Sequence, residues 1–487
     1  MSTDVLVIGG GLAGIACAVG LTDSGLRVTL VERSRALGGR AGSCRDSVTG
    51  DVVDVGPHVL LTQYPNLLRL LENLGTRDRI AWDLEQVMTL VDRGIAVGIR
   101  GTVLPAPFHL LPSLLRVPTI STRDLLSNHH VSWFVVRAKE EDLLRLDDVD
   151  ALTFLRRMNT SPRFIEWFWA TVSMAIMNVP LERCSAGALL RFYRILLAHR
   201  NLHLGCPEVG LAELFEAEAM RRVEGGGGRV ILEREVEKLV DDTQGVTAAV
   251  MKDGGRIEAE VYVCAVEPAA LAQLLPSRLL DRHGPLGGLE SFVPSPYISS
   301  YIWFDRKLTH ARNWARTWSP RNLNYDFYDL SNIRRGWEHR PSVIAGNIIY
   351  CHRAAHLDDD EIVRATVAEI AELAPEAAAA KVCHARVHHV PMAIPCPHPG
   401  LERKRPPVET PLPNLYLAGD WVDTGLPASM EGAVRAGSLA AERVLAKLGR
   451  PRRLALHVTR TRGILSLTAR GRAADVDRWT RYGAPMA

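Results

Sequence analysis

A carboxylate and the start of a helix stand close together near the end of this 487-residue chain. The segment NLYLAGDWVDTGLPASMEGAVRAG, from Asn414 to Gly437, reads as a short apolar strand, the pair Gly419 and Asp420, a polar turn, and then a helix. A helix N-terminus attracts anions through its unpaired N–H groups and its dipole. The segment therefore predicts a site at which one ligand meets both a carboxylate and a helix N-terminus.

A second anion-binding pattern opens the chain. The segment DVLVIGGGLAGIACAVGLTDSGLRVTLVER, from Asp4 to Arg33, reads as strand, glycine turn, helix, turn and strand. Gly9, Gly11 and Gly14 form G-x-G-x-x-G, which permits a tight turn, close approach to a pyrophosphate, and close packing of the helix on the strand. Glu32 ends the second strand about 20 residues later, where a carboxylate can accept hydrogen bonds from a ribose. The pattern predicts a dinucleotide-binding unit.

The residues that follow favour a flavin over a nicotinamide dinucleotide. ERSRALGGRAGS, from Glu32 to Ser43, resembles the second phosphate-side motif of flavoproteins in the amine oxidase and phytoene desaturase superfamily. In that superfamily a C-terminal Gly-Asp binds the flavin half of FAD, and Asp420 matches it. The resemblance implies that FAD is the cofactor and that both ends of the chain fold onto it. It assigns these residues to the cofactor site: Gly9, Gly11, Leu12, Ala13, Gly14, Glu32, Arg33, Gly39, Arg40, Gly56, Pro57, His58, Val236, Gly419, Asp420, Met430, Glu431, Gly432 and Ala433.

The composition is that of an ordinary globular chain. Hydrophobic residues make up 47% of the sequence and charged residues 23%, which fits two or three domains. The net charge of +3 gives no reason to expect a nucleic-acid partner. The eight cysteines are scattered without a C-x-x-C pair, so we expect no metal site, no disulfide framework and a reducing, cytoplasmic compartment. We also expect neither a signal peptide nor a membrane-spanning helix.

Two segments in the middle of the chain have strand patterns that belong with the nucleotide unit. They are EGGGGRVILEREVEKLV, from Glu224 to Val240, and EAEVYVCAVEP, from Glu258 to Pro268. The resemblance places the strand near Val236 beside the adenine. Residues 145–200 have a helical pattern, and residues 293–304 have a strand pattern. We predict an α/β fold: a discontinuous Rossmann-type FAD domain (1–95, 205–285 and 405–448), an inserted α+β substrate domain (96–204 and 286–404), and a basic C-terminal extension (449–487).

Two segments suggest a lipid surface. VLPAPFHLLPSLLRVP, from Val103 to Pro118, is apolar and carries one formal charge, Arg116. It fits either a buried connection or an interfacial segment that dips into a bilayer. The chain from Ala446 to Ala487 holds ten Lys or Arg residues and two Asp residues, which fits a solvated tail or contact with anionic headgroups. We expect peripheral binding to the inner face of a bacterial cytoplasmic membrane, and the sequence leaves the oligomeric state open.

Four segments together resemble the hydroxysqualene dehydroxylase family, the squalene-associated FAD-dependent enzymes of hopanoid-producing bacteria. They are the C-terminal motif, VDVGPHVLLTQYPNLLRLLENLG (Val53 to Gly75), MNVPLERCSAGALL (Met177 to Leu190) and CPEVGLAELF (Cys206 to Phe215). The likeness extends from residue 4 to about residue 447, but much of 305–345 departs from it. It implies a long isoprenoid substrate and reductive replacement of the allylic hydroxyl of hydroxysqualene by hydrogen, which gives squalene.

Three alternatives share this fold. Carotenoid desaturases also need an apolar tunnel and remain open. Amine oxidases use a framing tyrosine and a lysine near the flavin, but here Ser429 occupies the tyrosine position and the strand from Tyr297 to Phe304 contains no lysine. Rab escort and dissociation-inhibitor proteins bind prenylated partners without flavin, and the intact glycines together with Asp420 argue against that alternative.

Removal of a hydroxyl group needs a proton donor. We consider His58, in DVGPHVL, because the corresponding stretch of the superfamily passes beside the flavin ring; a structural histidine fits equally well. Asp423 is a second candidate, with a structural role near the following helix as its alternative. Four apolar side chains could line the substrate tunnel or belong to the core: Trp167, Trp169, Met174 and Phe192.

Overall fold

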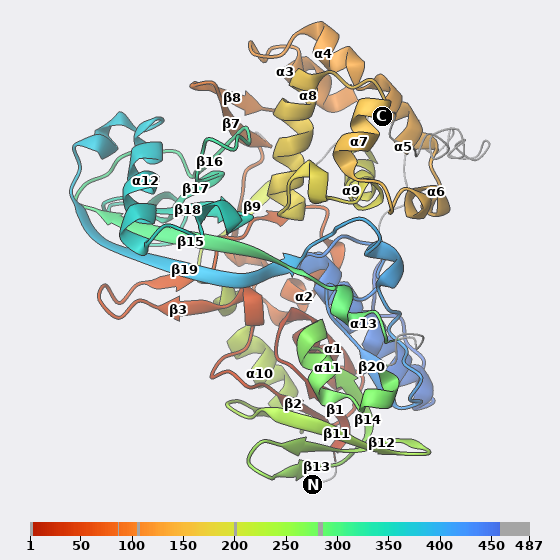
Figure 1. Ribbon diagram of the computed structural model, residues 1–487. Coiled ribbons are helices and arrows are strands. Elements are labelled where there is room, and N and C mark those ends of the chain that lie inside the picture. The colour runs from red at the N-terminus through yellow and green to blue at the C-terminus, as the bar shows by residue number, and fades with distance from the viewer. Residues whose placement is uncertain (1–2, 86, 105–107, 199–201, 281–285, 458–487) are drawn as a thin grey trace.

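The chain folds into a nucleotide-binding part, at the bottom of Figure 1, and a second part above it. The computed structural model describes residues 3–85, 87–104, 108–198, 202–280 and 286–457. Two long strands, β15 (Pro294–Phe304) and β19 (Val382–Pro395), pair in antiparallel fashion and run across the molecule between the two parts.

A five-stranded parallel sheet forms the centre of the nucleotide-binding part, in the order β10-β2-β1-β14-β20. The bounds are β10 (Arg229–Ile231), β2 (Val28–Val31), β1 (Thr3–Ile8), β14 (Ala259–Cys264) and β20 (Leu415–Leu417). Residues Val5 to Ile8 are buried, as a parallel strand covered on both faces requires. The strands come from the beginning, the middle and the end of the chain, which confirms the predicted discontinuous Rossmann-type fold.

The first and last helices of the nucleotide-binding part are neighbours. Helix α1 (Leu12–Thr22) packs against α13 (Met430–Lys447). A Cβ atom at Gly437 would lie 2.1 Å from the carbonyl oxygen of Ala13, so the two helices approach this closely because position 437 is glycine. Helices α2 (Pro65–Leu74) and α10 (Glu216–Gly225) pack against α13 and α1, respectively.

Short strands and one further helix complete this part. Strands β11 (Val236–Asp242), β12 (Gly245–Met251) and β13 (Arg256–Ile257) form an antiparallel sheet. Strand β3 (Ser43–Arg45) pairs with β4 (Val52–Asp54), and β9 (Leu204–Pro207) lies between β5 (Leu60–Leu61) and β6 (Ile80–Trp82). Helix α11 (Pro268–Leu274) packs against β11.

A seven-stranded sheet belongs to the second part, in the order β19-β15-β18-β17-β16-β7-β8. Its remaining strands are β18 (Val343–Ile349), β17 (Asp326–Asp329), β16 (Asn313–Arg316), β7 (Met88–Asp92) and β8 (Ile95–Ile99). The sequence pattern predicts an FAD domain whose first segment extends to residue 95. That boundary is too late, because β7 pairs with β16 and with β8 in this sheet.

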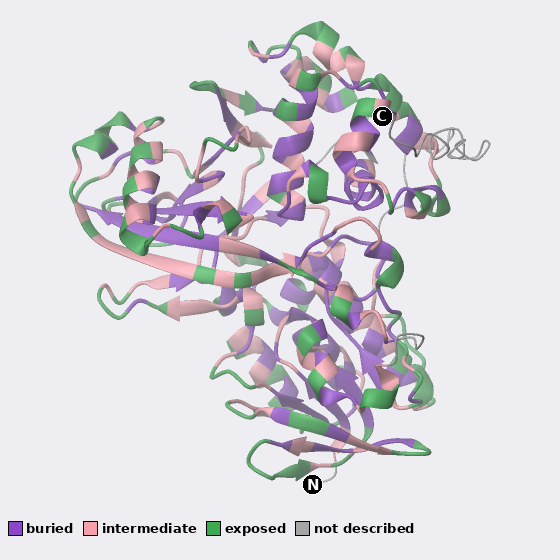
Figure 2. Cartoon of the chain, viewed as in Figure 1, coloured by how far each residue is buried: buried purple, intermediate pink, exposed green. Residues whose placement is uncertain are grey.

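Helices form the rest of the second part, beside the seven-stranded sheet. They are α3 (Leu111–Leu114), α4 (Thr122–Ser127), α5 (His129–Arg137), α6 (Glu140–Arg145), α7 (Ala151–Arg157), α8 (Pro162–Phe164) and α9 (Ala186–Ala198), with π-helical turns at Ile165–Ala170 and Ser173–Met177. Helix α12 (Asp359–Ala371) lies on the seven-stranded sheet. Buried residues fill the centre of both parts (Figure 2). One large hydrophobic cluster lies in the nucleotide-binding part, a second lies in the helical region, and smaller clusters lie on the seven-stranded sheet.

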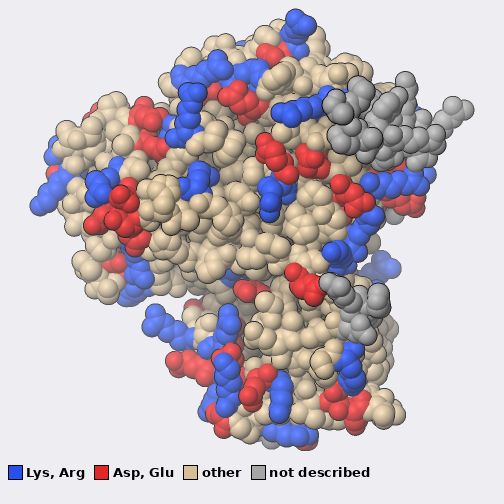
Figure 3. Space-filling model, in the orientation of Figure 1, with Lys and Arg blue, Asp and Glu red and all other residues tan. Residues whose placement is uncertain are grey.

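Basic and acidic side chains are mixed over the face shown in Figure 3, in keeping with the small net charge. Within the described ranges, no helix is long and apolar enough to cross a membrane. The same ranges contain no cluster of three or more His, Cys, Asp or Glu side chains arranged to hold a metal ion. Of the predicted basic extension, residues 458–487 lie outside the described residues. Residues 454–456 contact the nucleotide-binding part through Glu442 and Asn66.

Candidate functional site

A cavity of about 1020 Å³ is lined by residues from both parts of the chain. One end is bordered by the glycine turn after β1, the Gly39 segment and the start of α13. The other end is bordered by β15, β17 and β18 of the seven-stranded sheet and by the helical region. The cavity thus joins the predicted dinucleotide site to the predicted substrate domain.

The glycine turn leaves open space where a pyrophosphate would lie. Gly9 has φ +103°, and a Cβ atom at Gly14 would lie only 1.9 Å from the carbonyl oxygen of Gly9. In contrast, a Cβ atom at Gly11 would meet nothing within 4 Å. Helix α1 begins directly after Gly11, and no side chain caps its N-terminus. The turn is therefore closed on the protein side and open on the cavity side, which fits a bound dinucleotide phosphate.

The carboxylate of Glu32 is fixed at the end of β2. It accepts hydrogen bonds from the backbone N–H groups of Gly10 (2.6 Å) and Ser34 (2.8 Å). Glu32 also lines the cavity. Its position is the one from which a carboxylate binds the ribose of an adenine dinucleotide.

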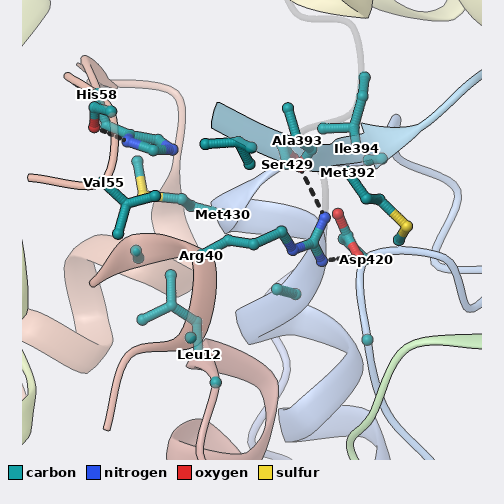
Figure 4. A pocket seen from close by; sticks show the side chains of 18 of the residues that line it. Leu12, Arg40, Val55, His58, Met392, Ala393, Ile394, Asp420, Ser429 and Met430 are labelled. Carbon is teal, nitrogen blue, oxygen red and sulfur yellow. Dashed lines mark hydrogen bonds and ion pairs between the residues drawn. The ribbon is translucent and has the colours of Figure 1, made fainter. Parts of the chain in front are cut away.

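Arg40 and Asp420 meet at the centre of the view in Figure 4. Arg40 Nη2 donates to Asp420 Oδ1 over 2.6 Å, and Arg40 Nη1 donates to the carbonyl oxygen of Ala393 over 2.8 Å. Both charged side chains line the cavity. The ion pair compensates the charge of Asp420, which is only 3% exposed. It therefore keeps a cation and a carboxylate together at the edge of the expected FAD site.

A buried arginine that the sequence analysis missed shapes the loop containing Asp420. Arg405 donates hydrogen bonds to the carbonyl oxygens of Asp420 (2.5 Å), Val422 (2.9 Å) and Leu426 (2.6 Å), and to that of Trp421 over 3.3 Å. Because these carbonyl groups belong to one irregular segment, a single guanidinium fixes its course. The segment ERKRPPVE around Arg405 carries no pattern that predicts this role.

Glu431 connects two helix N-termini. It is buried in the first turn of α13, and its carboxylate accepts hydrogen bonds from Asn66 N (3.1 Å), Asn66 Nδ2 (2.6 Å) and Leu67 N (2.8 Å) at the start of α2. Burial raises the pKa of Glu431 to about 7, although these hydrogen bonds oppose the shift. Glu431 therefore holds α2 and α13 together at the edge of the cavity.

Most of the residues expected at the cofactor site line the cavity, and two do not. Gly14 instead permits the close contact with Gly9 described above. The N–H group of Gly432 donates to Ser429 Oγ over 3.1 Å, which caps α13. These two positions therefore form the turn and the helix N-terminus without bordering the cavity. Those that line it are Gly9, Gly11, Leu12, Ala13, Glu32, Arg33, Gly39, Arg40, Gly56, Pro57, His58, Val236, Gly419, Asp420, Met430, Glu431 and Ala433.

Of the four residues expected at the substrate tunnel, two line the cavity and two do not. Met174 and Phe192 line the cavity, whereas Trp167 and Trp169 do not. Trp169 is fully buried, and its Nε1 donates to Asn128 Oδ1 over 2.9 Å. The placement of the two tryptophans at the tunnel was therefore wrong. Both belong to the core of the helical region.

His58 lines the cavity but is poorly suited to donate a proton. Its Nδ1 lies 2.7 Å from the carbonyl oxygen of Gly56 (Figure 4), so Nδ1 carries the hydrogen and donates it to that acceptor. Burial lowers the pKa of His58, which keeps the ring neutral and Nε2 unprotonated. The geometry favours the structural alternative for His58.

Asp423 lies outside the cavity. Its side chain is exposed, and Oδ1 accepts a hydrogen bond from the N–H group of Gly425 (3.1 Å) within its own turn. A carboxyl group in this position cannot reach a substrate in the cavity, so our second candidate for the proton donor is withdrawn.

Polar side chains that the sequence analysis missed stand at the substrate end of the cavity. Tyr297 donates its hydroxyl hydrogen to Asn347 Oδ1 (2.5 Å), and Tyr328 donates its own to Asp326 Oδ2 (2.7 Å). All four side chains line the cavity. The strand DFYD places two aspartates beside two aromatic residues, which is a signal for a buried polar group, because such strands seldom bury a carboxylate without a reason.

The chain matches one protein family and several known proteins along most of its length. Residues 12–445 match the family described as "Flavin containing amine oxidoreductase". The chain is 26% identical over 467 residues to 15-cis-phytoene desaturase of Synechococcus elongatus, covering 91% of this chain and 96% of the relative. It is 24% identical over 489 residues to zeta-carotene desaturase of Synechocystis, covering 92% and 98%.

Solved structures show the same fold. Putrescine oxidase bound to putrescine matches with a TM-score of 0.68 at 15% identity, covering 92% of this chain and 99% of the other. Cyclohexylamine oxidase from Brevibacterium oxydans matches with a TM-score of 0.69 at 18% identity, covering 92% and 100%. At these identities the likeness concerns the fold alone.

Proposed function

The chain belongs to the flavin-containing amine oxidoreductase family and is an FAD-dependent oxidoreductase, and we propose that its substrate is a long isoprenoid alcohol. The FAD assignment removes the flavin-free prenyl-binding alternative. The apolar part of the cavity supports a hydrocarbon chain as the substrate, with Met174, Ile176, Phe192, Ile195, Leu204 and Ile349 among its lining residues.

The reaction that we propose is the reductive dehydroxylation of hydroxysqualene to squalene. Bound reduced FAD supplies a hydride in this chemistry. The residues of the chain hold the apolar substrate, exclude water from the carbon that loses its hydroxyl group, and deliver one proton to the departing oxygen. The alcohol, the hydride and the proton together give one new carbon–hydrogen bond and one molecule of water.

One observation carries the choice of an alcohol over a pure hydrocarbon. Tyr297, Asn347, Tyr328 and Asp326 form a polar cluster in the otherwise apolar substrate end. A hydrocarbon offers these groups no hydrogen bond, whereas a substrate hydroxyl does. Burying such a cluster is costly, so its presence favours a substrate with a polar group at this end of the cavity.

Carotenoid desaturation is the second candidate. The names of the sequence relatives favour it, because phytoene and zeta-carotene desaturases match over nearly the whole chain. Amine oxidation has less support. Ser429 lines the cavity and caps α13 in place of a framing tyrosine, and β15 carries no lysine.

The deciding experiment compares three substrates. The purified protein, reduced with dithionite under anaerobic conditions, is incubated with hydroxysqualene, and squalene is measured by gas chromatography. Parallel reactions contain phytoene with an electron acceptor, or a simple amine in air. Squalene formation that depends on both protein and reductant supports dehydroxylation. Desaturated phytoene without squalene would replace our proposal by the second candidate.

We also propose peripheral contact with a membrane, on the cytoplasmic side of a bacterial membrane, through the segment from 103 to 133. This stretch exposes the large apolar side chains Val103, Leu104, Phe108, Leu111, Leu115, Leu126 and Trp133. The exposure of so many large apolar side chains argues against the alternative of a buried connection. Residues 105–107 of this segment lie outside the described residues. Arg116 and Arg123 are exposed in the same segment and suit anionic headgroups. A substrate dissolved in the bilayer gives such contact a purpose.

A further inference from the structure

The polar cluster at the substrate end contains one carboxyl group, that of Asp326. We propose that Asp326 is the acid that protonates the departing hydroxyl group, an inference that rests on the proposed dehydroxylation. Asp326 occupies the first position of β17, and its neighbour across the sheet is Asn347 on β18. Both side chains face the cavity, as does Tyr328, two residues further along β17.

The two oxygens of Asp326 have different surroundings. Oδ2 accepts a hydrogen bond from the Tyr328 hydroxyl group over 2.7 Å. Oδ1 is shielded from water and accepts no well-formed hydrogen bond from the described residues, although the Asn347 amide stands close enough to lower the pKa of the carboxyl group. A buried oxygen without a partner is costly in the ionised form, so the carboxyl group gains by carrying its proton on Oδ1. Because Oδ1 itself is covered, this proton reaches a substrate oxygen in the cavity by rotation of the carboxyl group about its Cβ–Cγ bond.

Direct contacts connect the cluster to the cofactor end of the cavity. A Cβ atom at Gly56 would lie 2.7 Å from the Tyr297 hydroxyl oxygen, so the segment bearing Gly56 lies against Tyr297. The Tyr297 hydroxyl group in turn donates to Asn347, the neighbour of Asp326. Ser299, also on β15, donates to the carbonyl oxygen of Val55 over 2.7 Å. Asp326 is therefore near the boundary between the FAD site and the apolar tunnel.

The surroundings favour the protonated carboxyl group in mildly acidic solution, up to about pH 6. Burial raises the pKa of Asp326 to about 6, although Tyr328 and Asn347 oppose the shift. The titratable groups around it are the phenols of Tyr297, Tyr325 and Tyr328, and burial raises the pKa of each well above 10. These phenols stay neutral while Asp326 titrates.

Two further groups, Asp54 and Cys206, lie close to these phenols, and neither disturbs the titration of Asp326. The charge of Asp54 raises the pKa of Tyr297, and this carboxylate forms an ion pair with Arg334 over 2.7 Å. Burial raises the pKa of Cys206, which lies close to Tyr328, to about 12, so this thiol is also neutral. Titration near pH 6 at this end of the cavity therefore belongs to Asp326.

The other groups considered as acids are occupied or remote. His58 Nδ1 already donates to Gly56, and its Nε2 is unprotonated. Both oxygens of Glu431 accept hydrogen bonds from the start of α2. Asp423 is exposed outside the cavity. Asp326 combines a raised pKa, an unpartnered oxygen and a place on the cavity wall.

The step is balanced with the proposed reactants. The O–H bond of Asp326 breaks and a new O–H bond forms on the substrate oxygen, while the allylic C–O bond breaks and water departs. The carbon accepts the hydride that reduced FAD supplies, so the substrate is reduced by two electrons. The Asp326 carboxylate then regains a proton from solvent after product and water leave.

The test replaces Asp326 by asparagine, which keeps the shape but cannot release a proton in this way. Under single-turnover anaerobic conditions, D326N should retain its FAD absorbance spectrum and the substrate concentration that gives half its maximal rate, and should lose about 10²- to 10⁴-fold in the rate of squalene formation. The wild-type rate should fall as pH rises through about 6, and D326N should lack this limb. The control E338Q removes an exposed carboxyl group from the chain segment between β17 and β18, outside the cavity lining, and should leave rate and pH profile unchanged.

Two further measurements separate chemistry from structure. In Y328F the carboxylate loses a donor that lowers its pKa, so the falling limb should move to higher pH. Replacing the substrate hydroxyl group by acetate, which leaves with less help from a proton, should narrow the gap between wild type and D326N. A merely structural Asp326 predicts neither result.

The outcomes distinguish the inference from the proposed function. Squalene formation by the wild type together with a wild-type rate in D326N overturns the role of Asp326 alone. Absence of squalene with the wild type overturns both. If D326N fails to bind FAD, infrared spectroscopy of the wild type and of Y328F decides the question. A band of a protonated carboxyl group that disappears as pH rises through about 6, and that responds to Y328F, supports the inference. Absence of this band at pH 5 rejects the inference.

Discussion

Arg40 and Asp420 are 380 positions apart in the chain, yet Arg40 Nη2 and Asp420 Oδ1 lie 2.6 Å apart in the cavity wall. Arg40 follows the first βαβ unit, whereas Asp420 precedes α13. The ion pair closes the site that the two ends of the chain build together. The same cavity then continues to the substrate end, where Asp326 stands.

Two glycine substitutions should have different consequences. Gly11→Val places a side chain in open space on the cavity side of the turn, so the protein should fold and lose FAD. Gly14→Ala drives a Cβ atom into the carbonyl group of Gly9, so the soluble yield or the melting temperature should fall. Flavin content after gel filtration and thermal unfolding measure the two effects. Normal flavin content in Gly11→Val would contradict the position of the phosphate site.

Replacement of Arg405 by methionine should disorganise the loop around Asp420. Each lost hydrogen bond from the buried guanidinium removes about 1.5–3 kcal/mol, and the released carbonyl groups keep no donor. We expect reduced FAD content and a lower melting temperature. The control is Arg403→Met, which removes an exposed arginine paired with the exposed Asp148. Equal flavin content in the two variants would show that the loop holds its course without Arg405.

His58→Gln should keep FAD and turnover within a few-fold of wild type, because the glutamine amide can also donate to the carbonyl group of Gly56. His58→Ala removes that donor and should lower FAD occupancy. Flavin content and single-turnover rates distinguish the variants. A loss of 100-fold or more in His58→Gln with full flavin would restore the histidine as proton donor.

The contribution of Glu431 to stability should depend on pH. Its pKa is about 7 in the folded chain, above the ordinary value of 4.5, so the stability linked to this group is fully present below pH 4.5 and is lost as pH rises through 7. Relative to Glu431→Gln, the wild type should lose about 2 kcal/mol between roughly pH 5.5 and pH 8. Denaturant unfolding of both proteins at each pH measures the difference. A constant difference would show that Glu431 is ionised throughout.

Binding to anionic vesicles should depend on the exposed apolar side chains near α3. The double variant Phe108→Asp with Leu115→Asp should sediment less with the vesicles, because a charged side chain opposes burial in the bilayer interface. Leu84→Asp alters an exposed leucine elsewhere and serves as the control. Deletion of residues 458–487 should remove most of the salt-sensitive binding. Wild-type protein that stays in the supernatant at low salt would refute membrane contact.

The amino-acid sequence alone determined the cofactor half of this protein. The Gly9, Gly11 and Gly14 spacing, the apolar run of β1 and the carboxylate at Glu32 act over a few neighbouring residues, so each constrains the backbone wherever it occurs. The same holds for Gly419 and Asp420 before α13. These local patterns predicted the parallel sheet and the dinucleotide end of the site, whereas FAD as the ligand and the flavin end at Asp420 were implied by the resemblance to a flavoprotein superfamily.

Only the tertiary structure decided which side chains share the substrate end. The helical pattern around Trp169 and Met174 is similar for both residues, but packing turns the first toward Asn128 and the second into the cavity. Strand β7 pairs with β16, which lies far along the chain, so its domain could not be inferred from its own residues. Arg405 and Asp326 acquire their roles from carbonyl groups and phenols contributed by other segments. Such contacts depend on the pairing of distant strands and loops, and this pairing leaves no local periodicity in the sequence.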